Sequence, residues 1–527
     1  MASLMYSSED ELSTDDEWDL CESHEPWNSP HEMSDEDNDY NDFHATRYMK
    51  FTDDNPTTYH TIRRFSEELE KNSFTYIPEK EPLGDDTLNK FLEGGLFYTT
   101  RSALTLIAFA IGRHWEPKSG MGVVGAHVDA LTVKLKPITL QSKIDGYHLL
   151  GVAPYSGALN KLWLDRDLGI GGRVIVRNED GTISTKLVKL DHPIAKIPSI
   201  AEHFIDFDQQ IYNKESKMVP IIGYSDEDID DNAEIPTEEE KAGPLVNFHS
   251  IHLLRYISKL SDTPILRLLG LDLELYDTQA ASRGGLSDEF IFAPRVDDRL
   301  CAYTAIEALI RVSKSTSLLD WDELNMVVLC DNEEIGSATR TGVKGKFLNA
   351  TVTRILEAKQ KTKEREFREH PQNPDEIENI LTKEYSPSLL FANTVILSAD
   401  VTHALNPNFK SAYLPNHFPL PNTGLTIKRD ANMHVMTDSI GVAFMEAIAK
   451  KNGLKLQSFH IKNGTPSGGT IGPMISCDTG ARTIDVGIPQ LSMHSIRAMF
   501  GYKDVNLGID TFDAFFRDYR LYEQFNV

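Results

Sequence analysis

Short apolar runs rich in Val, Ile and Leu, each ending in polar residues, constrain the fold of this chain more than any other feature. They occupy residues 122–128, 325–330 and 394–397, and helical spacing of apolar side chains appears between them, as in residues 300–310. Buried strands that alternate with helices form a mostly parallel sheet covered by helices on both faces. The pattern therefore predicts an α/β domain.

The middle of the chain has a different pattern. Residues 132–284 contain short β-type segments separated by Gly and Pro turns, together with an acidic loop after Tyr224. We interpret this stretch as a β-rich domain inserted into the α/β domain, which would then comprise residues 47–131 and 285–527. Residues 359–383 form a third, charged segment that we expect to be an exposed helix and loop.

The negative charge is concentrated in two stretches. Residues 1–46 hold 15 Asp or Glu and no Lys or Arg, and residues 226–240 hold another 9 acidic residues with no base. Without these stretches the net charge of −27 falls to −3, so the globular part lacks the basic surface that nucleic-acid binding requires. Residues 1–46 have too little aliphatic content to fold, and we expect a disordered acidic tail with order beginning near Phe51. The tail is either a solvated extension or a docking segment.

No apolar run approaches the roughly 20 residues that span a bilayer, and residues 104–111 have the length of a core strand. The N-terminus also lacks the basic and apolar regions of a secretory signal. Four widely spaced cysteines without a CxxC pattern fit a reducing compartment. We therefore expect no membrane insertion and a cytoplasmic location, with the vacuole lumen, reached without a signal peptide, as the alternative.

Residues that can bind metals follow the predicted strands. His127 and Asp129 follow the first, Glu333 and Glu334 the second, and Asp400 the third. Functional groups in α/β sheets collect at the carboxyl ends of strands, so these residues are expected to meet in one crevice. Two further candidates are Asp297, at the predicted start of a helix, and His494.

Each candidate also has an ordinary structural explanation. A lone His at a strand end is more often structural, an acidic pair is usually solvated, and an Asp before a helix often caps its free amides. Five sites, three of them at strand ends, favour a shared function, because packing does not require His and carboxylate side chains there.

The residue types suggest a division of labour. Strand alternation places His127 and Asp129 on one face, so Asp129 could accept the ring N–H and leave the other nitrogen free for a metal. One residue of the Glu333–Glu334 pair can bind metal while the other remains a general base. His127, Asp297, Glu334, Asp400 and His494 would then supply two nitrogens and three carboxylates, which are enough for two zinc ions if Asp297 bridges them.

Eight ordered motifs allow a comparison with known families. They are Asn-Pro-Thr-Thr-Tyr-His at 55–60, Gly-Ala-His-Val-Asp-Ala at 125–130, Trp-Leu-Asp-Arg-Asp-Leu at 163–168, Val-Asp-Asp-Arg-Leu at 296–300, Asp-Asn-Glu-Glu-Ile-Gly-Ser at 331–337, Ser-Ala-Asp at 398–400, Ser-Gly-Gly-Thr-Ile-Gly-Pro at 467–473 and Leu-Ser-Met-His-Ser-Ile-Arg at 491–497. With these motifs the chain resembles, from about Asp54 to its C-terminus, the zinc-dependent dodecameric aminopeptidases that include vacuolar aminopeptidase I and aspartyl aminopeptidase.

The resemblance implies a metallo-exopeptidase fold, two Zn²⁺ per subunit with Co²⁺ or Mn²⁺ as alternatives in one site, and peptide substrates. It places the same five residues on the family's metal positions and Glu333 on its general base. It also implies that His203 holds the substrate or its oxyanion from the inserted domain of a neighbouring subunit. Dimers joined through that domain would then assemble into a dodecamer.

Two positions near the substrate have open interpretations. His403 is similar to a family substrate contact, and a plain structural His is the alternative. Lys428 matches a Lys that in aspartyl aminopeptidases would pair with an acidic first side chain, and a solvent-exposed strand Lys is the alternative. The chain also departs from the vacuolar members, which carry an amphipathic N-terminal propeptide where this sequence has an acidic tail.

The expected activity is hydrolysis of the first peptide bond, with Glu333 deprotonating the attacking water. Two alternatives stay open. One is a dizinc deacylase that acts on small amides, and the other is a non-enzymatic role in which the assembled particle serves as transport cargo or a scaffold.

Overall fold

The computed structural model describes residues 35–190, 192–204, 213–225, 235–369, 384–466 and 468–525. Contacts divide the chain into two compact units, Met1–Asp39 and Tyr40–Val527. Residues 1–34 of the expected acidic tail, 226–234 of the acidic loop, 370–383 of the charged segment and Ser467 of the glycine-containing motif lie outside the described residues.

A nine-stranded sheet forms the centre of the second unit. Its order is β1(Thr75–Tyr76), β2(Gly95–Arg101), β3(Thr105–Ile111), β13(Leu324–Cys330), β4(Gly122–His127), β14(Val395–Ala399), β18(Arg482–Gly487), β16(Thr426–Arg429) and β17(Gln457–His460). The four strands β13, β4, β14 and β18 are parallel neighbours, whereas the β2/β3, β3/β13 and β16/β18 pairs are antiparallel. The predicted α/β fold is confirmed, with a mixed sheet whose centre is parallel.

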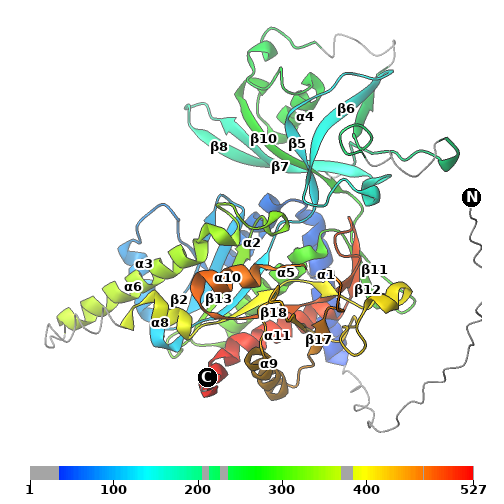
Figure 1. Cartoon of the computed structure of the whole chain (residues 1–527). Helices are drawn as coiled ribbons and strands as arrows, with labels where there is room; N and C mark the ends of the chain where they lie inside the picture. The colour runs from blue at the N-terminus through cyan, green and yellow to red at the C-terminus, as the bar shows by residue number, and fades with distance from the viewer. Residues whose placement is uncertain are drawn as a thin grey trace, which may run out of the picture. The chain divides into compact units, whose positions relative to one another are not determined.

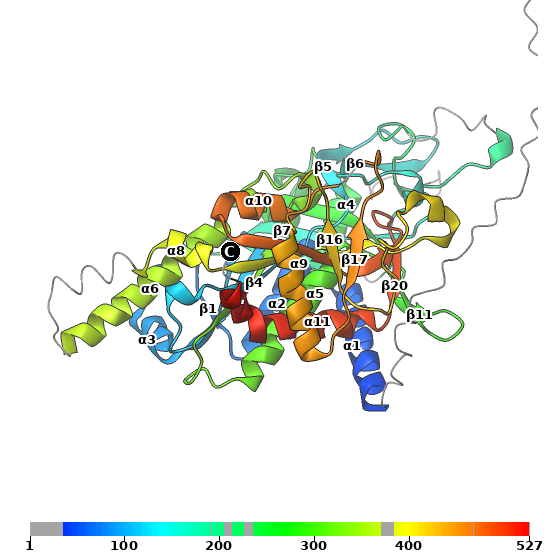
Figure 2. The same cartoon turned by 60° about the horizontal axis from the view of Figure 1, so that its bottom comes forward.

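Helices cover both faces of this sheet (Figure 1). Strand alternation sends Ala108 and Val124 into one core, and Ile107 and Val123 into the other. The first core is closed by α1(Asp35–Asp54), α2(Thr58–Lys71), α5(Val296–Ser315), α9(Ser439–Asn452) and α11(Asp504–Asp518). The second is closed by α3(Asp85–Glu93), α6(Phe347–Glu369), α8(Pro387–Ala392) and α10(Ile471–Thr479). Figure 2 shows α9 and α11 in front of the sheet and α6 with α8 beside it.

A six-stranded antiparallel sheet with α4(Ile251–Ser261) lies within the stretch expected to be inserted (Figure 1). Its order is β8(Ile183–Lys189), β7(Leu168–Arg177), β10(Leu268–Asp277), β5(Thr132–Leu140), β6(Tyr147–Tyr155) and β9(Ile221–Tyr224). Val133, Trp163, Leu254 and Leu275 belong to a separate hydrophobic core of this sheet.

A small five-stranded sheet connects the metal-capable loops. Its order is β11(Ser282–Gly284), β12(Phe290–Ala293), β20(Ala498–Gly501), β19(Pro489–Leu491) and β15(Thr402–His403). β15 begins two residues after Asp400, and β19 ends three residues before His494. The sheet therefore fixes the loops that present both residues.

The prediction that order begins near Phe51 was wrong. The helix α1 begins at Asp35, and Ala45, Tyr48 and Phe51 are buried. The Tyr48 ring lies 5.5 Å from that of Tyr303, and the Phe51 ring 5.0 Å from that of Phe65. The predicted tail, residues 1–46, ends inside this short apolar stripe, whose members are spaced three residues apart, so its acidic composition concealed only Ala45.

Candidate metal centre

The carboxyl ends of three neighbouring parallel strands bring the candidate residues together. His127 is the last residue of β4, Asp400 directly follows β14, and Glu333 lies three residues beyond β13 in a 3₁₀ turn, Glu333–Ile335. Because β13, β4 and β14 are adjacent and parallel, their ends lie at one edge of the sheet. The strand pattern in the sequence correctly anticipated this edge.

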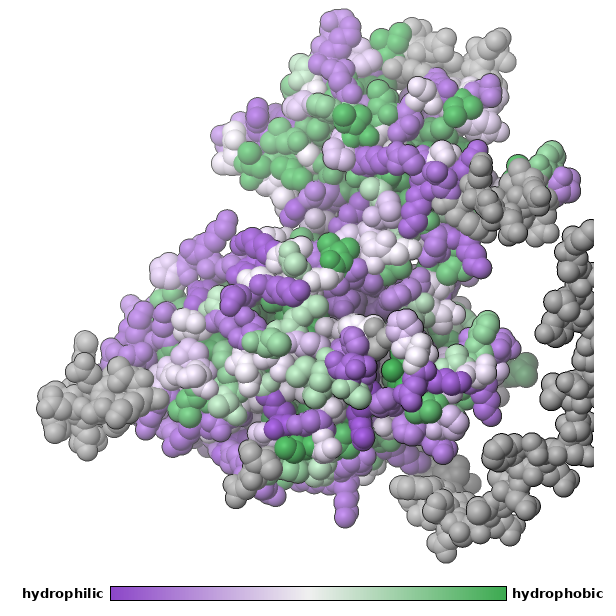
Figure 3. Space-filling model, in the orientation of Figure 1, coloured by the Kyte–Doolittle hydropathy of each residue, from purple (hydrophilic) through white to green (hydrophobic). Residues whose placement is uncertain are grey.

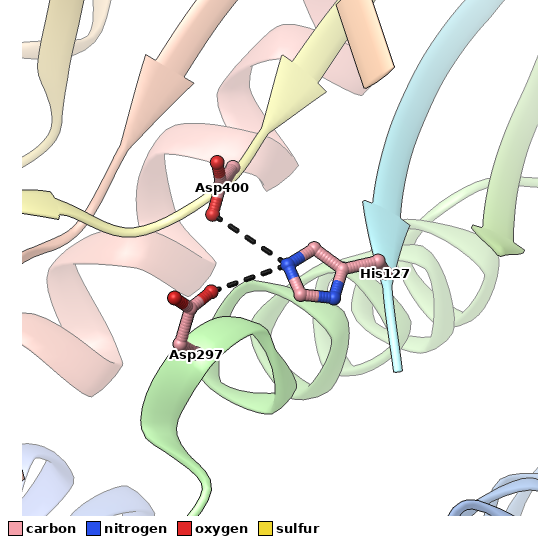
Figure 4. Close-up of side chains that lie close together, drawn as sticks. All are labelled: His127, Asp297 and Asp400. Atoms are coloured by element: carbon pink, nitrogen blue, oxygen red, sulfur yellow. Dashed lines mark hydrogen bonds and ion pairs between the residues drawn. The ribbon is translucent and has the colours of Figure 1, made fainter. Parts of the chain in front are cut away.

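His127, Asp297 and Asp400 form a first group of potential ligands (Figure 4). Nε2 of His127 lies 3.2 Å from Oδ1 of Asp297 and 3.8 Å from Oδ1 of Asp400. Asp297 stands at the start of α5 before its regular turns begin. Its carboxylate faces histidine rings, so the interpretation of Asp297 as a simple helix cap does not describe its contacts.

Asp297, Glu334 and His494 form a second group. Nε2 of His494 lies 3.4 Å from Oδ2 of Asp297 and 3.8 Å from Oε2 of Glu334. The two groups share Asp297, which directs Oδ1 toward His127 and Oδ2 toward His494. The structure thus brings all five proposed ligands together around one carboxylate.

The two glutamates are buried among other acids. Burial raises the pKa of Glu333 to about 7 and that of Glu334 to about 9, and the neighbouring carboxylates add to both shifts. Oε1 of Glu334 is buried and has no hydrogen-bond partner among the residues that the structure describes. Such a crowd of carboxylates is unfavourable unless cations neutralise it. Imidazole and carboxylate groups with an unpartnered buried oxygen are a donor set that fits divalent zinc.

Asp129 contacts His127 and also holds the loop that bears the two glutamates. Nδ1 of His127 is hydrogen-bonded to the main-chain carbonyl oxygen of Asp129 at 3.1 Å, and Oδ1 of the Asp129 carboxylate lies 3.3 Å away. The Asp129 carboxylate also accepts hydrogen bonds from the backbone amides of Glu333 and Glu334, both at 3.1 Å. These amide contacts were not predicted from the sequence.

Comparisons with known proteins identify the family of this chain. A family model described as aminopeptidase I zinc metalloprotease (M18) matches residues 51–516. The chain belongs to this family of zinc aminopeptidases. It is therefore a metalloaminopeptidase, a hydrolase of the exopeptidase class.

The most similar relatives cover nearly the whole aminopeptidase. Vacuolar aminopeptidase 1 of Saccharomyces cerevisiae is 45% identical over 489 residues, which are 91% of this chain and 89% of the relative. Aspartyl aminopeptidase of Aspergillus oryzae is 34% identical and covers 90% of this chain and 96% of its own length. A solved structure described as the mApe1 dodecamer of S. cerevisiae superposes with a TM-score of 0.79 at 42% identity, covering 93% of this chain and 99% of its own.

A cleft of about 360 Å³ opens beside the ligand groups of the aminopeptidase. Its lining includes His127, Glu333 and Asp400 together with the apolar side chains of Val435, Phe459, Ile461 and Met493. A cleft that combines metal-capable groups with an apolar wall can hold a peptide end and one side chain.

Lys428 lines this cleft but is only 7% exposed, so the interpretation as a solvent-exposed strand lysine is wrong. Its Nζ lies 3.3 Å from Oδ2 of Asp400 and donates a hydrogen bond to the carbonyl of Val401 at 3.1 Å. The ammonium group of Lys428 thus contacts the side chain of Asp400 and the main chain of Val401.

The two remaining histidines occupy different places. His403 lines the cleft, with its ring 6.3 Å from that of Phe459. His203 is exposed in a 3₁₀ turn, Glu202–Phe204, and does not belong to the lining of this chain's own cleft. Its proposed contact with substrate therefore requires another copy of the chain.

Proposed function

We propose that this aminopeptidase removes N-terminal residues from peptides with two zinc ions held by His127, Asp297, Glu334, Asp400 and His494. The observation that supports two ions is the shared position of Asp297, whose two oxygens face separate histidines at 3.2 and 3.4 Å. Each side completes its group with one further carboxylate, from Asp400 or Glu334. When bound, such a pair polarises the scissile carbonyl and makes a water molecule more acidic.

Glu333 is the proposed general base. Its Oε2 lies 4.0 Å from Nε2 of His127, which places the carboxylate beside the proposed ligand groups. The carboxylate takes a proton from water while the water oxygen attacks the carbonyl carbon of the first peptide bond. As the C–N bond breaks, Glu333 passes this proton to the leaving amine. Asp129 keeps the carboxylate in reach by holding the Glu333 amide.

The remaining side chains of the cleft would position the substrate. His403 and the apolar wall formed by Val435, Phe459 and Met493 lie where the first residue of a peptide would bind. The free α-amine of a peptide would be held beside the ligand groups, and an N-acylated amide lacks this amine.

We infer a homo-oligomer in which the six-stranded sheet joins two copies and His203 enters the cleft of the partner. Exposed apolar side chains on β5, β6 and β9 support this role of the sheet, namely Ile138, Leu140, Tyr147 and Tyr224. Figure 3 shows hydrophobic side chains on the surface of the group of strands that includes β5 to β8. The solved S. cerevisiae relative is a dodecamer, which we propose for this chain too.

We infer a location in the cytoplasm or the vacuole, since the relative with 45% identity is a vacuolar aminopeptidase. None of the described helices is long and apolar enough to cross a membrane. Peptides are the proposed partners, besides other copies of the chain.

The decisive experiment compares Glu333→Gln with Glu446→Gln, an exposed glutamate on α9. We expect Glu333→Gln to keep its bound zinc and to lose turnover of aminoacyl substrates, whereas Glu446→Gln keeps both. A chelator should abolish wild-type activity, and N-acylated amides should be poor substrates. Retained activity in Glu333→Gln would remove the proposed mechanism, and preferred cleavage of N-acylated amides would favour a deacylase.

A further inference from the structure

The loop that carries Glu333 and Glu334 depends on a side chain from the six-stranded sheet. Tyr155 is the last residue of β6 and is 8% exposed. Its hydroxyl donates a hydrogen bond to Oδ2 of Asp129 at 2.8 Å. The same Oδ2 accepts the backbone amide of Glu334, while Oδ1 accepts that of Glu333. The Tyr155 hydroxyl is therefore bonded directly to the Asp129 carboxylate, which accepts both backbone amides.

The hydroxyl of Tyr155 also acts as an acceptor. Nδ2 of Asn332 donates to it at 2.8 Å. Asn332 directly precedes Glu333 and has a left-handed backbone conformation, with φ of 62°. Its Oδ1 accepts hydrogen bonds from the hydroxyls of Thr339 and Thr341 at 2.7 and 3.1 Å. One hydroxyl thus contacts the loop from both directions, through Asp129 and through Asn332.

The position of this hydroxyl is set by the six-stranded sheet. Tyr155 pairs with Thr132 in the β5/β6 ladder, at the end of the sheet where β5 begins. Nζ of Lys134, also on β5, lies 4.3 Å from the centre of the Tyr155 ring, which is a favourable cation–π distance. The ring is therefore held by the stretch between residues 132 and 155, whereas Glu333 follows a strand of the nine-stranded sheet.

We propose that Tyr155 is a positioning residue for the reaction: it transmits the placement of the six-stranded sheet to the Glu333–Glu334 loop through Asp129 and Asn332. This inference rests on the proposed function of Glu333. A general base works efficiently when its carboxylate is held within a few tenths of an ångström of its reacting position. Hydrogen bonds to the loop that carries it, such as those of Tyr155, Asp129 and Asn332, restrict its movement.

The contacts also explain why a single hydroxyl matters. Removing it leaves Asp129 without one of its donors and leaves the Asn332 amide without its acceptor, while the aromatic ring keeps its packing. The loop then gains alternative positions, and Glu333 spends less time in the reactive one. Substrate contacts in the cleft are untouched, so the loss falls on kcat and not on KM.

The test compares Tyr155→Phe with Tyr276→Phe in the full-length protein. Tyr276 lies in the same sheet on β10, is also buried, and its hydroxyl bonds to the backbone of Leu190. We expect Tyr155→Phe to lower kcat by about 10-fold or more, the usual cost of an outer-contact change, with KM within about twofold and zinc content unchanged. Tyr276→Phe should leave kcat close to that of the wild type.

A double-mutant cycle with Asn332→Gly tests whether the two residues act through the same loop. Glycine tolerates the left-handed backbone at this position, so it removes the amide without strain. If both residues act through the same loop, the double variant loses less activity than the product of the two single losses. Fully multiplicative losses would overturn the proposal.

Other results would contradict the proposed role of Tyr155 as directly. An unchanged kcat in Tyr155→Phe, or a fall that accompanies a melting temperature well below that of Tyr276→Phe, would assign Tyr155 to folding alone. Glu333→Gln, measured in the same assay, separates the two proposals. If it is inactive while Tyr155→Phe is fully active, Glu333 remains the base and only the role of Tyr155 is wrong.

Discussion

The ammonium group of Lys428 forms an ion pair with Asp400, with Nζ 3.3 Å from Oδ2. Both partners are shielded from solvent, and the same Nζ binds the carbonyl of Val401. A lysine engaged in this way is poorly placed to receive an acidic substrate side chain, because that contact would compete with Asp400. Lys428 therefore stabilises the proposed ligand Asp400.

Replacing Lys428 by Ala should consequently lower kcat/KM for Leu and Asp substrates by a similar factor of about 10-fold or more. The comparison is made on aminoacyl amides, with Lys450→Ala, an exposed lysine of α9, as the control. A selective loss of Asp cleavage with unchanged Leu cleavage would instead show that Lys428 pairs with acidic side chains.

Removing the shared carboxylate should have a larger effect on metal content than removing a histidine from one side. Asp297→Ala takes a ligand from both groups, whereas His494→Ala takes one only from the second. We expect elemental analysis to find about two zinc ions per chain in the wild type, about one in His494→Ala and fewer in Asp297→Ala. Equal loss in both variants would contradict the bridging role.

The strands and the residues at their ends could be predicted from the sequence, because both depend on the pattern of neighbouring residues. Alternation and strand ends place His127, Glu333 and Asp400 at one sheet edge, and the structure has this arrangement. The contacts of Asp129 with two amides more than 200 residues away were not predictable, because no spacing rule relates positions joined only by the fold. Tyr155 was missed for the same reason.

The buried state of Lys428 shows a second limit. Its strand looks amphipathic in sequence, and only the ion pair with Asp400 reveals why a lysine is tolerated inside. The helix α1 shows a third, since the acidic composition of residues 1–46 concealed the start of a helix whose Tyr48 and Phe51 pack against α2, α5 and β20.

The contribution of α1 can be measured with Tyr48→Ala. Tyr48 is fully buried, and its ring lies 5.5 Å from Tyr303 and 5.6 Å from Phe500. Truncation of a buried aromatic ring costs about 3 kcal/mol or more, so the melting temperature should fall by several degrees. Tyr40→Ala on the same helix is the control, because Tyr40 is 61% exposed. Equal melting temperatures for the two variants would mean that α1 does not stabilise the fold.

Stability should also depend on pH through Glu323, which directly precedes β13, whereas Glu333 and Glu334 follow the opposite end of that strand. Burial, followed by the nearby Asp322 carboxylate, raises the pKa of Glu323 to about 8, from a usual value near 4.5. Between these two values the folded chain keeps a proton that the unfolded chain has released. The stability associated with neutral Glu323 is therefore complete below about pH 4.5 and is lost as the pH rises through 8.

Glu323→Gln stays neutral and can still accept the hydrogen bond from Nε1 of Trp321. We expect its melting temperature to match that of the wild type near pH 5 and to exceed it near pH 9, whereas Glu446→Gln follows the wild type throughout. A constant difference between Glu323→Gln and wild type across this range would show that Glu323 ionises normally in the folded protein.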